Sequence, residues 1–99
     1  MILVAGRIVL RAGTFEQARP HMERVITATR QEAGCRTYTF GRDLLEPDAI
    51  RSFEIWESRE ALDAHGAAPH MQAWRAALQE IGVVARELQT WETGEGQPL

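Results

Sequence analysis

Residues 32–71 decide the fold, and they contain Glu32-Ala33-Gly34-Cys35-Arg36-Thr37-Tyr38-Thr39-Phe40, then Phe53-Glu54-Ile55-Trp56-Glu57-Ser58-Arg59-Glu60-Ala61-Leu62-Asp63-Ala64-His65, and finally Pro69-His70-Met71. Glycine is the usual residue just beyond a helix, so Gly34 predicts that a helix ends there and that a strand follows. A second strand ends at Trp56, and Ser58 is a typical N-cap for the helix that carries His65. The stretch therefore predicts a helix, two strands and a second helix in succession.

The segments on either side complete this pattern. Thr14, with Gln17 three residues later, predicts a helix that starts with a capping box and runs to Gly34. Pro20 lies inside this helix and removes one backbone hydrogen bond, which predicts a kink and not an end. The other predicted elements are strands over 2–10, 35–43, 49–57 and 83–92, and helices over 58–67 and 69–81.

The predicted order is β-α-β-β-α-β, which is the order of ferredoxin-like α+β folds. Ninety-nine residues are enough for one domain and too few for two. We therefore assign residues 1–93 to a single domain and residues 94–99, Gly-Glu-Gly-Gln-Pro-Leu, to a flexible tail.

Composition excludes several function classes. A net charge of −3 without a basic cluster argues against nucleic-acid binding, and all eleven basic residues are arginine, so lysine Schiff-base chemistry is excluded. Met1 leads directly into an apolar strand without a basic segment, and the single cysteine cannot form an intramolecular disulfide. We expect a cytoplasmic protein without an export signal or a membrane span.

The first predicted strand is apolar on both alternating faces. Ile2, Val4, Ile8 and Leu10 share one face, while Leu3, Ala5 and Val9 share the other. Helices can cover only one face of a ferredoxin-like sheet, and exposed apolar patches usually mark an interface. The sequence therefore predicts a homodimer in which two sheets pack face to face, although a monomer with an apolar face is the alternative.

Two histidines are candidates for the chemistry. His65 lies one turn after Ala61 and Leu62, on the side of its helix that should face the sheet, where it can exchange a proton near neutral pH or form a structural hydrogen bond. His70, in the first turn of the next helix, lines a pocket or is solvated. Because a helix break separates the two histidines, their spacing does not predict a metal site.

Other side chains can form the walls and donors of a site. Tyr38 is the only tyrosine, and we expect it to share a strand face with Arg36. Trp56 and Trp74 are large enough to enclose an aromatic ligand or to fill the core. Glu54 lies on the same strand face as Trp56, and we expect an ion pair between Glu54 and an arginine such as Arg7, Arg36 or Arg51.

The motifs quoted first resemble those of the antibiotic biosynthesis monooxygenase family, small dimeric α+β barrels that include quinol monooxygenases. The resemblance covers the chain from its first strand to about Trp91. It implies a homodimer and a functional histidine at His65, since family members commonly carry one at this place in a Trp-x-Ser…His pattern. The heme-degrading branch also uses an asparagine, and this chain contains none, so that reaction is disfavoured.

The expected activity is oxidation of a quinol or another hydroxyaromatic by dioxygen, with no flavin, heme or metal. Such chemistry needs a base, a water-excluding cavity and a hydrogen-bond donor. We assign the base to His65, the donor to Tyr38 or Arg36, and substrate contacts to Trp56, His70 and Trp74. An isomerase acting on a small carbonyl compound and a non-catalytic dimeric binding protein remain the alternatives, because a fold does not determine a reaction.

Overall fold

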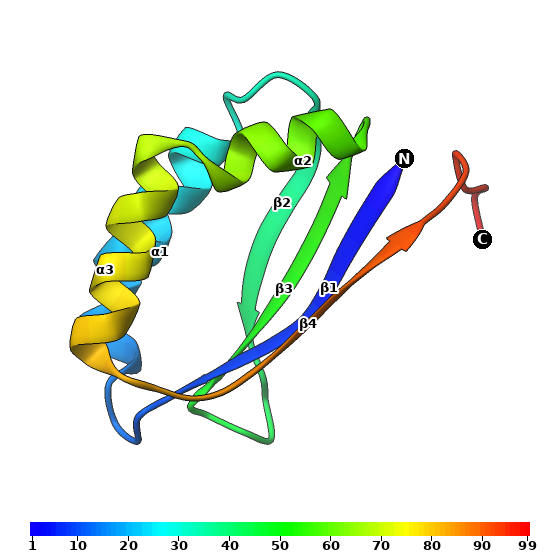
Figure 1. Cartoon of the computed structure of the whole chain (residues 1–99). Coiled ribbons are helices and arrows are strands. Elements are labelled where there is room, and N and C mark those ends of the chain that lie inside the picture. The colour runs from blue at the N-terminus through cyan, green and yellow to red at the C-terminus, as the bar shows by residue number, and fades with distance from the viewer.

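The computed structural model describes residues 1–99 and contains one four-stranded antiparallel sheet covered by helices on one face (Figure 1). The elements are β1 (Ile2–Leu10), α1 (Phe15–Thr29), β2 (Cys35–Arg42), β3 (Ala49–Trp56), α2 (Arg59–Gly66), α3 (Pro69–Ile81) and β4 (Val83–Glu92). The strand order is β2-β3-β1-β4, with β1 paired to both β3 and β4. This arrangement confirms the predicted ferredoxin-like α+β fold.

Helices α1 and α3 lie side by side across the sheet, and α2 lies at the end where β3 terminates (Figure 1). The apolar stripe of α1 faces the sheet, as helical spacing requires. Its buried residues are Phe15, Ala18, Met22, Val25 and Thr29. The four apolar ones pack with Ile8, Leu10, Ile50, Trp74 and Ile81 in the main core. No helix of the structure is long and apolar enough to cross a membrane.

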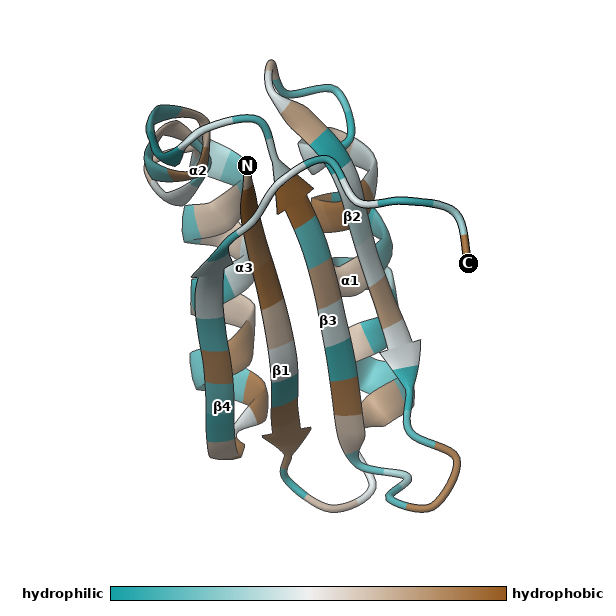
Figure 2. Cartoon of the chain, turned by 90° about the vertical axis from the view of Figure 1, so that its right-hand side faces the viewer, coloured by the Kyte–Doolittle hydropathy of each residue, from teal (hydrophilic) through white to brown (hydrophobic).

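The other face of the sheet carries no helix, and Figure 2 shows it in front of the helices. Strand pairing places Leu3 beside Ile55 on one side and Trp91 on the other, so these three side chains form an apolar row across the outer face. Phe53, which pairs with Ala5 and lies two residues before Ile55 on β3, is 40% exposed. Trp91 is 48% exposed. The second apolar face predicted for β1 is therefore real and uncovered in a single chain.

The beginning of α1 differs from the prediction. The Thr14 side chain makes no capping hydrogen bond to the helix, and its hydroxyl instead donates to the carbonyl of Arg11 at 2.7 Å. The capping-box prediction was therefore wrong, because the hydroxyl is used within the preceding turn. Pro20 does lie inside a continuous helix, as predicted.

The end of α1 also differs, since the helix stops at Thr29 and not at Gly34. Turns connect the helix to β2, and Gly34 adopts a left-handed backbone with φ of +81°. A Cβ atom at Gly34 would lie 2.6 Å from the Cβ of Ala61 in α2. The glycine thus lets the turn pass directly against α2, which brings residues of this turn close to His65.

Candidate functional site

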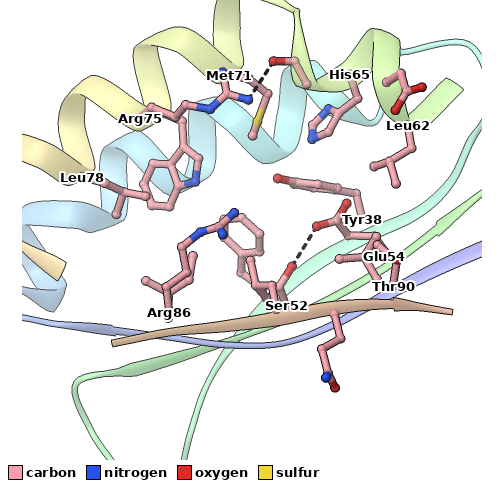
Figure 3. Close-up of a pocket in the computed structure, with 18 residues that line it drawn as sticks. Tyr38, Ser52, Glu54, Leu62, His65, Met71, Arg75, Leu78, Arg86 and Thr90 are labelled. Carbon is pink, nitrogen blue, oxygen red and sulfur yellow. Dashed lines mark hydrogen bonds between the residues drawn. The ribbon is translucent and has the colours of Figure 1, made fainter. Parts of the chain in front are cut away.

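A cavity of about 420 Å³ lies between the sheet and helices α2 and α3 (Figure 3). Its apolar lining includes Val4, Ile8, Phe40, Met71, Trp74 and Leu78. Its polar lining includes Tyr38, Ser52, Glu54, His65, Arg75 and Arg86. A concave apolar space with a few convergent polar groups is the usual form of a small-molecule site, and this volume suits a small aromatic ligand.

His65 occupies the wall of this cavity and is 3% exposed. The hydroxyl of Ser58 accepts a hydrogen bond from the Ala61 N–H at 3.1 Å, so the cap predicted for α2 is confirmed and fixes the start of the helix. The imidazole points from α2 toward the ring of Tyr38, with 5.2 Å between ring centroids (Figure 3). The Trp56 ring lies 4.6 Å from the imidazole.

Glu32, in the turn before β2, determines which nitrogen of His65 is available. Its Oε2 atom lies 2.6 Å from Nδ1 of His65, and only 16% of the Glu32 side chain is exposed. A carboxylate oxygen accepts hydrogen bonds, so Nδ1 carries the proton in the neutral imidazole and Nε2 keeps its lone pair. This geometry is that of a base oriented by a carboxylate.

The same carboxylate also contacts His70 of α3, whose Nε2 lies 3.2 Å from Glu32 Oε2. One donor atom from each of Glu32, His65 and His70 lies within 4.8 Å of the other two. The sequence spacing had argued against such a cluster, but the α2–α3 turn brings the histidines together. Two imidazoles and a carboxylate are ligands that divalent transition metals bind. In this structure the carboxylate accepts a hydrogen bond from His65.

Tyr38 lies on the floor of the cavity with 3% of its surface exposed, and its hydroxyl points into the cavity (Figure 3). Burial, followed by the negative charge of Glu54, raises the pKa of Tyr38 far above its ordinary value. The phenol therefore stays protonated at neutral pH. It can donate a hydrogen bond to an oxyanion, but it does not act as a base.

Glu54 lies on β3 beside Tyr38 in the sheet and is 7% exposed. Its Oε1 accepts a hydrogen bond from Nε1 of Trp56 at 2.9 Å. Its Oε2 accepts one from the Ser52 hydroxyl at 3.2 Å (Figure 3). The predicted ion pair between Glu54 and an arginine is therefore wrong. Its partners are neutral groups two residues away on the same strand face, which the two-residue strand period brings alongside it.

The structure brings only some of the predicted site residues into the cavity. His65, Tyr38 and Trp74 line it, whereas Trp56 is fully buried behind His65 and supports the wall from outside. His70 lines a separate hollow between α1 and α3.

Arg36 lies elsewhere, although we expected it to share a strand face with Tyr38. The pairing of β2 with β3 shifts register between Cys35 and Thr37. At the surface, the Arg36 guanidinium makes salt bridges to Glu95 at 3.1 Å and to Glu57 at 3.7 Å. The strand irregularity thus moves Arg36 away from the cavity, and the regular alternation used for the prediction fails there.

Sequence reasoning did not assign Glu32 and Arg86 to the site. Arg86 comes from β4 and points into the cavity, and its guanidinium has no hydrogen-bond or ion-pair partner (Figure 3). Arg75, at the rim, donates to the Gly66 carbonyl at 2.7 Å. Glu32 lies 33 residues before His65, so no local pattern links the two. For Arg86, the one available indication was its pairing with Ile8, whose side chain faces the helices.

The sequence model of the antibiotic biosynthesis monooxygenase family matches residues 1–77, which include β1, β2, β3 and the cavity histidine His65 of α2. This chain belongs to the antibiotic biosynthesis monooxygenase family. The match covers well over half of its residues, and confirms the resemblance first noted between residues 32 and 71.

Two relatives of this antibiotic biosynthesis monooxygenase family member match most of its length. Rv0793 of Mycobacterium tuberculosis, provisionally named a monooxygenase, is 35% identical over 83 residues, which are 81% of this chain and 78% of that protein. The uncharacterized protein sll1783 of Synechocystis is 29% identical over 98 residues, which are 99% of this chain and 67% of that protein.

A solved structure gives the same answer for the fold. A Deinococcus radiodurans protein, provisionally described as an antibiotic biosynthesis monooxygenase, superposes with a TM-score of 0.91 at 27% identity. The alignment covers 100% of this chain and 98% of that one. The sheet order and the helical layer are therefore those of the family, and the side chains of the cavity must distinguish this member from others.

Proposed function

We propose that this family member is a monooxygenase that oxidises a hydroxyaromatic compound of the quinol class with dioxygen, and that it needs no flavin, heme or metal. The observation that carries the proposal is the Glu32–His65 pair at an apolar cavity. Glu32 holds Nδ1 of a buried imidazole at 2.6 Å, which leaves Nε2 as a proton acceptor beside a space suited to one aromatic ring.

The reaction begins when Nε2 of His65 removes a proton from a substrate hydroxyl. The resulting phenolate transfers one electron to dioxygen, and the aryloxyl radical and superoxide then combine to form a carbon–oxygen bond. The proton returns from His65 when the oxygen–oxygen bond breaks. One oxygen atom stays on the ring, and the other leaves as water with the two hydrogens that the quinol loses on becoming a hydroxyquinone.

Three features of the cavity assist these steps. Tyr38 remains a phenol and can donate a hydrogen bond to the phenolate oxygen. Trp74 and Phe40, whose ring centroids lie 5.8 Å apart, form an aromatic wall for the substrate ring. The apolar lining limits water, which favours recombination of the radical pair over escape of superoxide.

Oxygen consumption with quinol substrates tests this proposal. We expect the parent protein to consume one dioxygen per quinol, with 18O from the gas recovered in the product. His65→Ala should lower kcat by roughly 10²- to 10⁴-fold, the usual contribution of one positioned base. His21→Ala, which removes a histidine outside the cavity, should keep the parent rate. A parent-like His65→Ala enzyme would contradict the assignment.

An isomerase of a small carbonyl compound is the second candidate. The observation in its favour is that the cavity holds two groups able to exchange protons, His65 and Glu54, on different walls. One can remove a proton from carbon while the other delivers a proton to the neighbouring atom. Deuterium exchange from solvent into a carbonyl substrate, without oxygen consumption, would favour this reaction. Ligand binding with neither outcome would favour a non-catalytic binding protein.

We also propose that two copies of the chain pack through their outer sheet faces. The row formed by Leu3, Ile55 and Trp91, with Phe53 beside it, supports this because contiguous exposed apolar surface usually marks an interface. Such a homodimer would bury more than about 1,200 Å² in total, the size of a specific interface.

A further inference from the structure

Glu32, His65 and His70 form a cluster whose donor atoms converge on one point. Oε2 of Glu32 lies 2.6 Å from Nδ1 of His65 and 3.2 Å from Nε2 of His70. The three donor atoms lie within 4.8 Å of one another. The ligands of a tetrahedral zinc ion, at bond lengths of about 2.0–2.2 Å, are roughly 3.3 Å apart. Small side-chain rotations therefore place all three donors around one ion.

Nε2 of His70 shows that the protein alone does not satisfy this cluster. The atom lies near the Glu32 carboxylate, but it is shielded from solvent and makes no hydrogen bond. Buried polar atoms in folded proteins usually have a partner. A buried imidazole nitrogen without one, beside a carboxylate and a second imidazole, is therefore free to bind a ligand.

The position of the cluster separates it from the substrate. His65 lines the cavity, whereas Glu32 and His70 do not. Nδ1 of His65 faces Glu32, so the imidazole ring stands between the cluster and the cavity (Figure 3). His70 also lines the hollow between α1 and α3, from which an ion can reach the cluster. An ion bound there acts on the cavity only through His65.

We propose that Glu32, His65 and His70 bind a divalent transition-metal ion such as Zn²⁺, and that the bound ion inhibits the enzyme. To coordinate the ion, Nδ1 of His65 must give up its proton, and the neutral ring then carries a proton on Nε2 instead. Nε2 becomes a hydrogen-bond donor and cannot accept a proton from the substrate. The inhibition, but not the binding of the ion, rests on the proposed function, because it requires His65 to be the base.

The donor set selects the class of ion. Two imidazoles and one carboxylate suit zinc and its neighbours in the first transition row, whereas calcium and magnesium prefer sites made of oxygen ligands. Three protein ligands leave a fourth position of a tetrahedral ion for water. The side chain of His70 is 25% exposed and that of Glu32 is 16% exposed, so solvent can supply this water.

Zinc binding can be measured without any turnover. Competition of the metal-free protein with a chromophoric zinc chelator should give one zinc ion per chain, with a Kd on the order of 1 µM or below. His70→Gln should weaken binding by at least about 100-fold, because loss of a ligand costs more than loss of an outer partner. Zinc should raise the Tm of the parent by at least about 5 °C and that of His70→Gln by less than about 1 °C.

His21→Gln is the matched control. His21 is the only other histidine and lines the same hollow as His70, but it is not part of the cluster. This variant should bind zinc with the parent affinity and show the parent rise in Tm. A cooperative melt of each variant without zinc establishes that lost binding is not lost folding.

Two further measurements test the inhibition. In 15N NMR spectra of the parent, the His65 proton should lie on Nδ1 without zinc and on Nε2 with zinc. In oxygen-consumption assays with a quinol, free zinc at ten times its Kd should lower the parent rate roughly tenfold, since only the metal-free fraction turns over. The same zinc concentration should change the rate of His70→Gln by less than about twofold.

Absence of zinc binding to the parent up to about 1 mM, an equal affinity in His70→Gln, or an equal loss in His21→Gln would overturn the metal site. Zinc that binds but leaves the His65 proton on Nδ1, or that increases turnover, would overturn the inhibition. Zinc binding through His70 with the change of tautomer, in a protein that consumes no oxygen, would support the metal site and refute the monooxygenase.

Discussion

His65 can act as a base toward the cavity only in the tautomer that keeps the proton on Nδ1. In a free imidazole both neutral tautomers are populated, so the protein must select one. The carboxylate of Glu32 does so through Oε2, which lies 2.6 Å from Nδ1 of His65, and Nε2 of His70 lies 3.2 Å from the same oxygen. Glu32 is thus a positioning residue, which acts on the substrate only through the imidazole.

Replacing Glu32 by alanine should lower kcat by about 10- to 100-fold, the equivalent of the 1.5–3 kcal/mol of a hydrogen bond to a charged group. KM should change little, because Glu32 does not line the cavity. In 15N NMR spectra, His65 of Glu32→Ala should show both neutral tautomers, while the parent shows one. A single, unchanged tautomer in the variant would contradict the positioning role.

Tyr38 should make the stability of the protein depend on alkaline pH. Burial raises its pKa in the folded state, so above about pH 10 the unfolded chain loses this proton while the folded chain keeps it. Stability contributed by Tyr38 is therefore complete below pH 10 and falls above it, by up to about 1.4 kcal/mol per pH unit.

Urea titrations between pH 8 and pH 11 would measure this slope. Burial also raises the pKa of the Cys35 thiol, with the same sign, so the comparison belongs in a Cys35→Ser background. Tyr38→Phe should reduce the slope above pH 10. Since Tyr38 is the only tyrosine, the phenolate absorbance at 295 nm should increase only when the protein unfolds. Phenolate absorbance in the folded protein at pH 10 would contradict the prediction.

At the scale of elements, the turn between α1 and β2 determines how closely α2 can approach the sheet. Gly34→Ala forces a side chain into a left-handed backbone and places its Cβ 2.6 Å from that of Ala61. Gly13→Ala, also at positive φ but with no neighbour within 4 Å, isolates the backbone cost. We expect losses of at least about 2 kcal/mol at Gly34 and about 1 kcal/mol at Gly13.

Denaturant unfolding of both variants would measure the difference. Adding Ala61→Gly to Gly34→Ala removes the atom that clashes, so the double variant should lose less stability than the sum of its two single changes. Simple addition of the two losses would show that the contact does not limit the packing of α2.

The elements could be predicted from sequence because their signals are local. Alternating apolar residues, the Ser58 cap, and Pro69 and Gly82 at the two ends of α3 each act within a few residues. The end of α1 was mispredicted at Gly34, since a glycine at positive φ serves a tight turn as well as a helix end.

The site was less predictable, because some of its contacts join residues that are far apart in the sequence. His65, Tyr38 and Trp74 were found from their positions on helix or strand faces. The pairing of Glu32 with His65 depends on how a turn and a helix pack, which no spacing encodes. Arg36 was misplaced because a strand irregularity broke the two-residue period.

At the scale of the whole molecule, the outer sheet face predicts the oligomeric state. We expect light scattering at micromolar concentration to give the mass of a dimer. Phe53→Glu should give the mass of a monomer, because it places a charge on the outer face beside the apolar row. Ala76→Glu adds the same charge on the exposed face of α3 and should remain dimeric. A monomeric parent would refute the interface.

The alternation of β1 has one further consequence. Val4 and Ile8 form part of the cavity floor, while Leu3 and Ala5, their neighbours in the chain, lie on the outer face. A single layer of backbone therefore separates whatever fills the cavity from whatever covers the outer face. If a second copy covers that face, binding at the two places is thermodynamically linked, and linkage is reciprocal. Any factor by which pairing of two chains tightens a quinol is the factor by which the quinol tightens the pair.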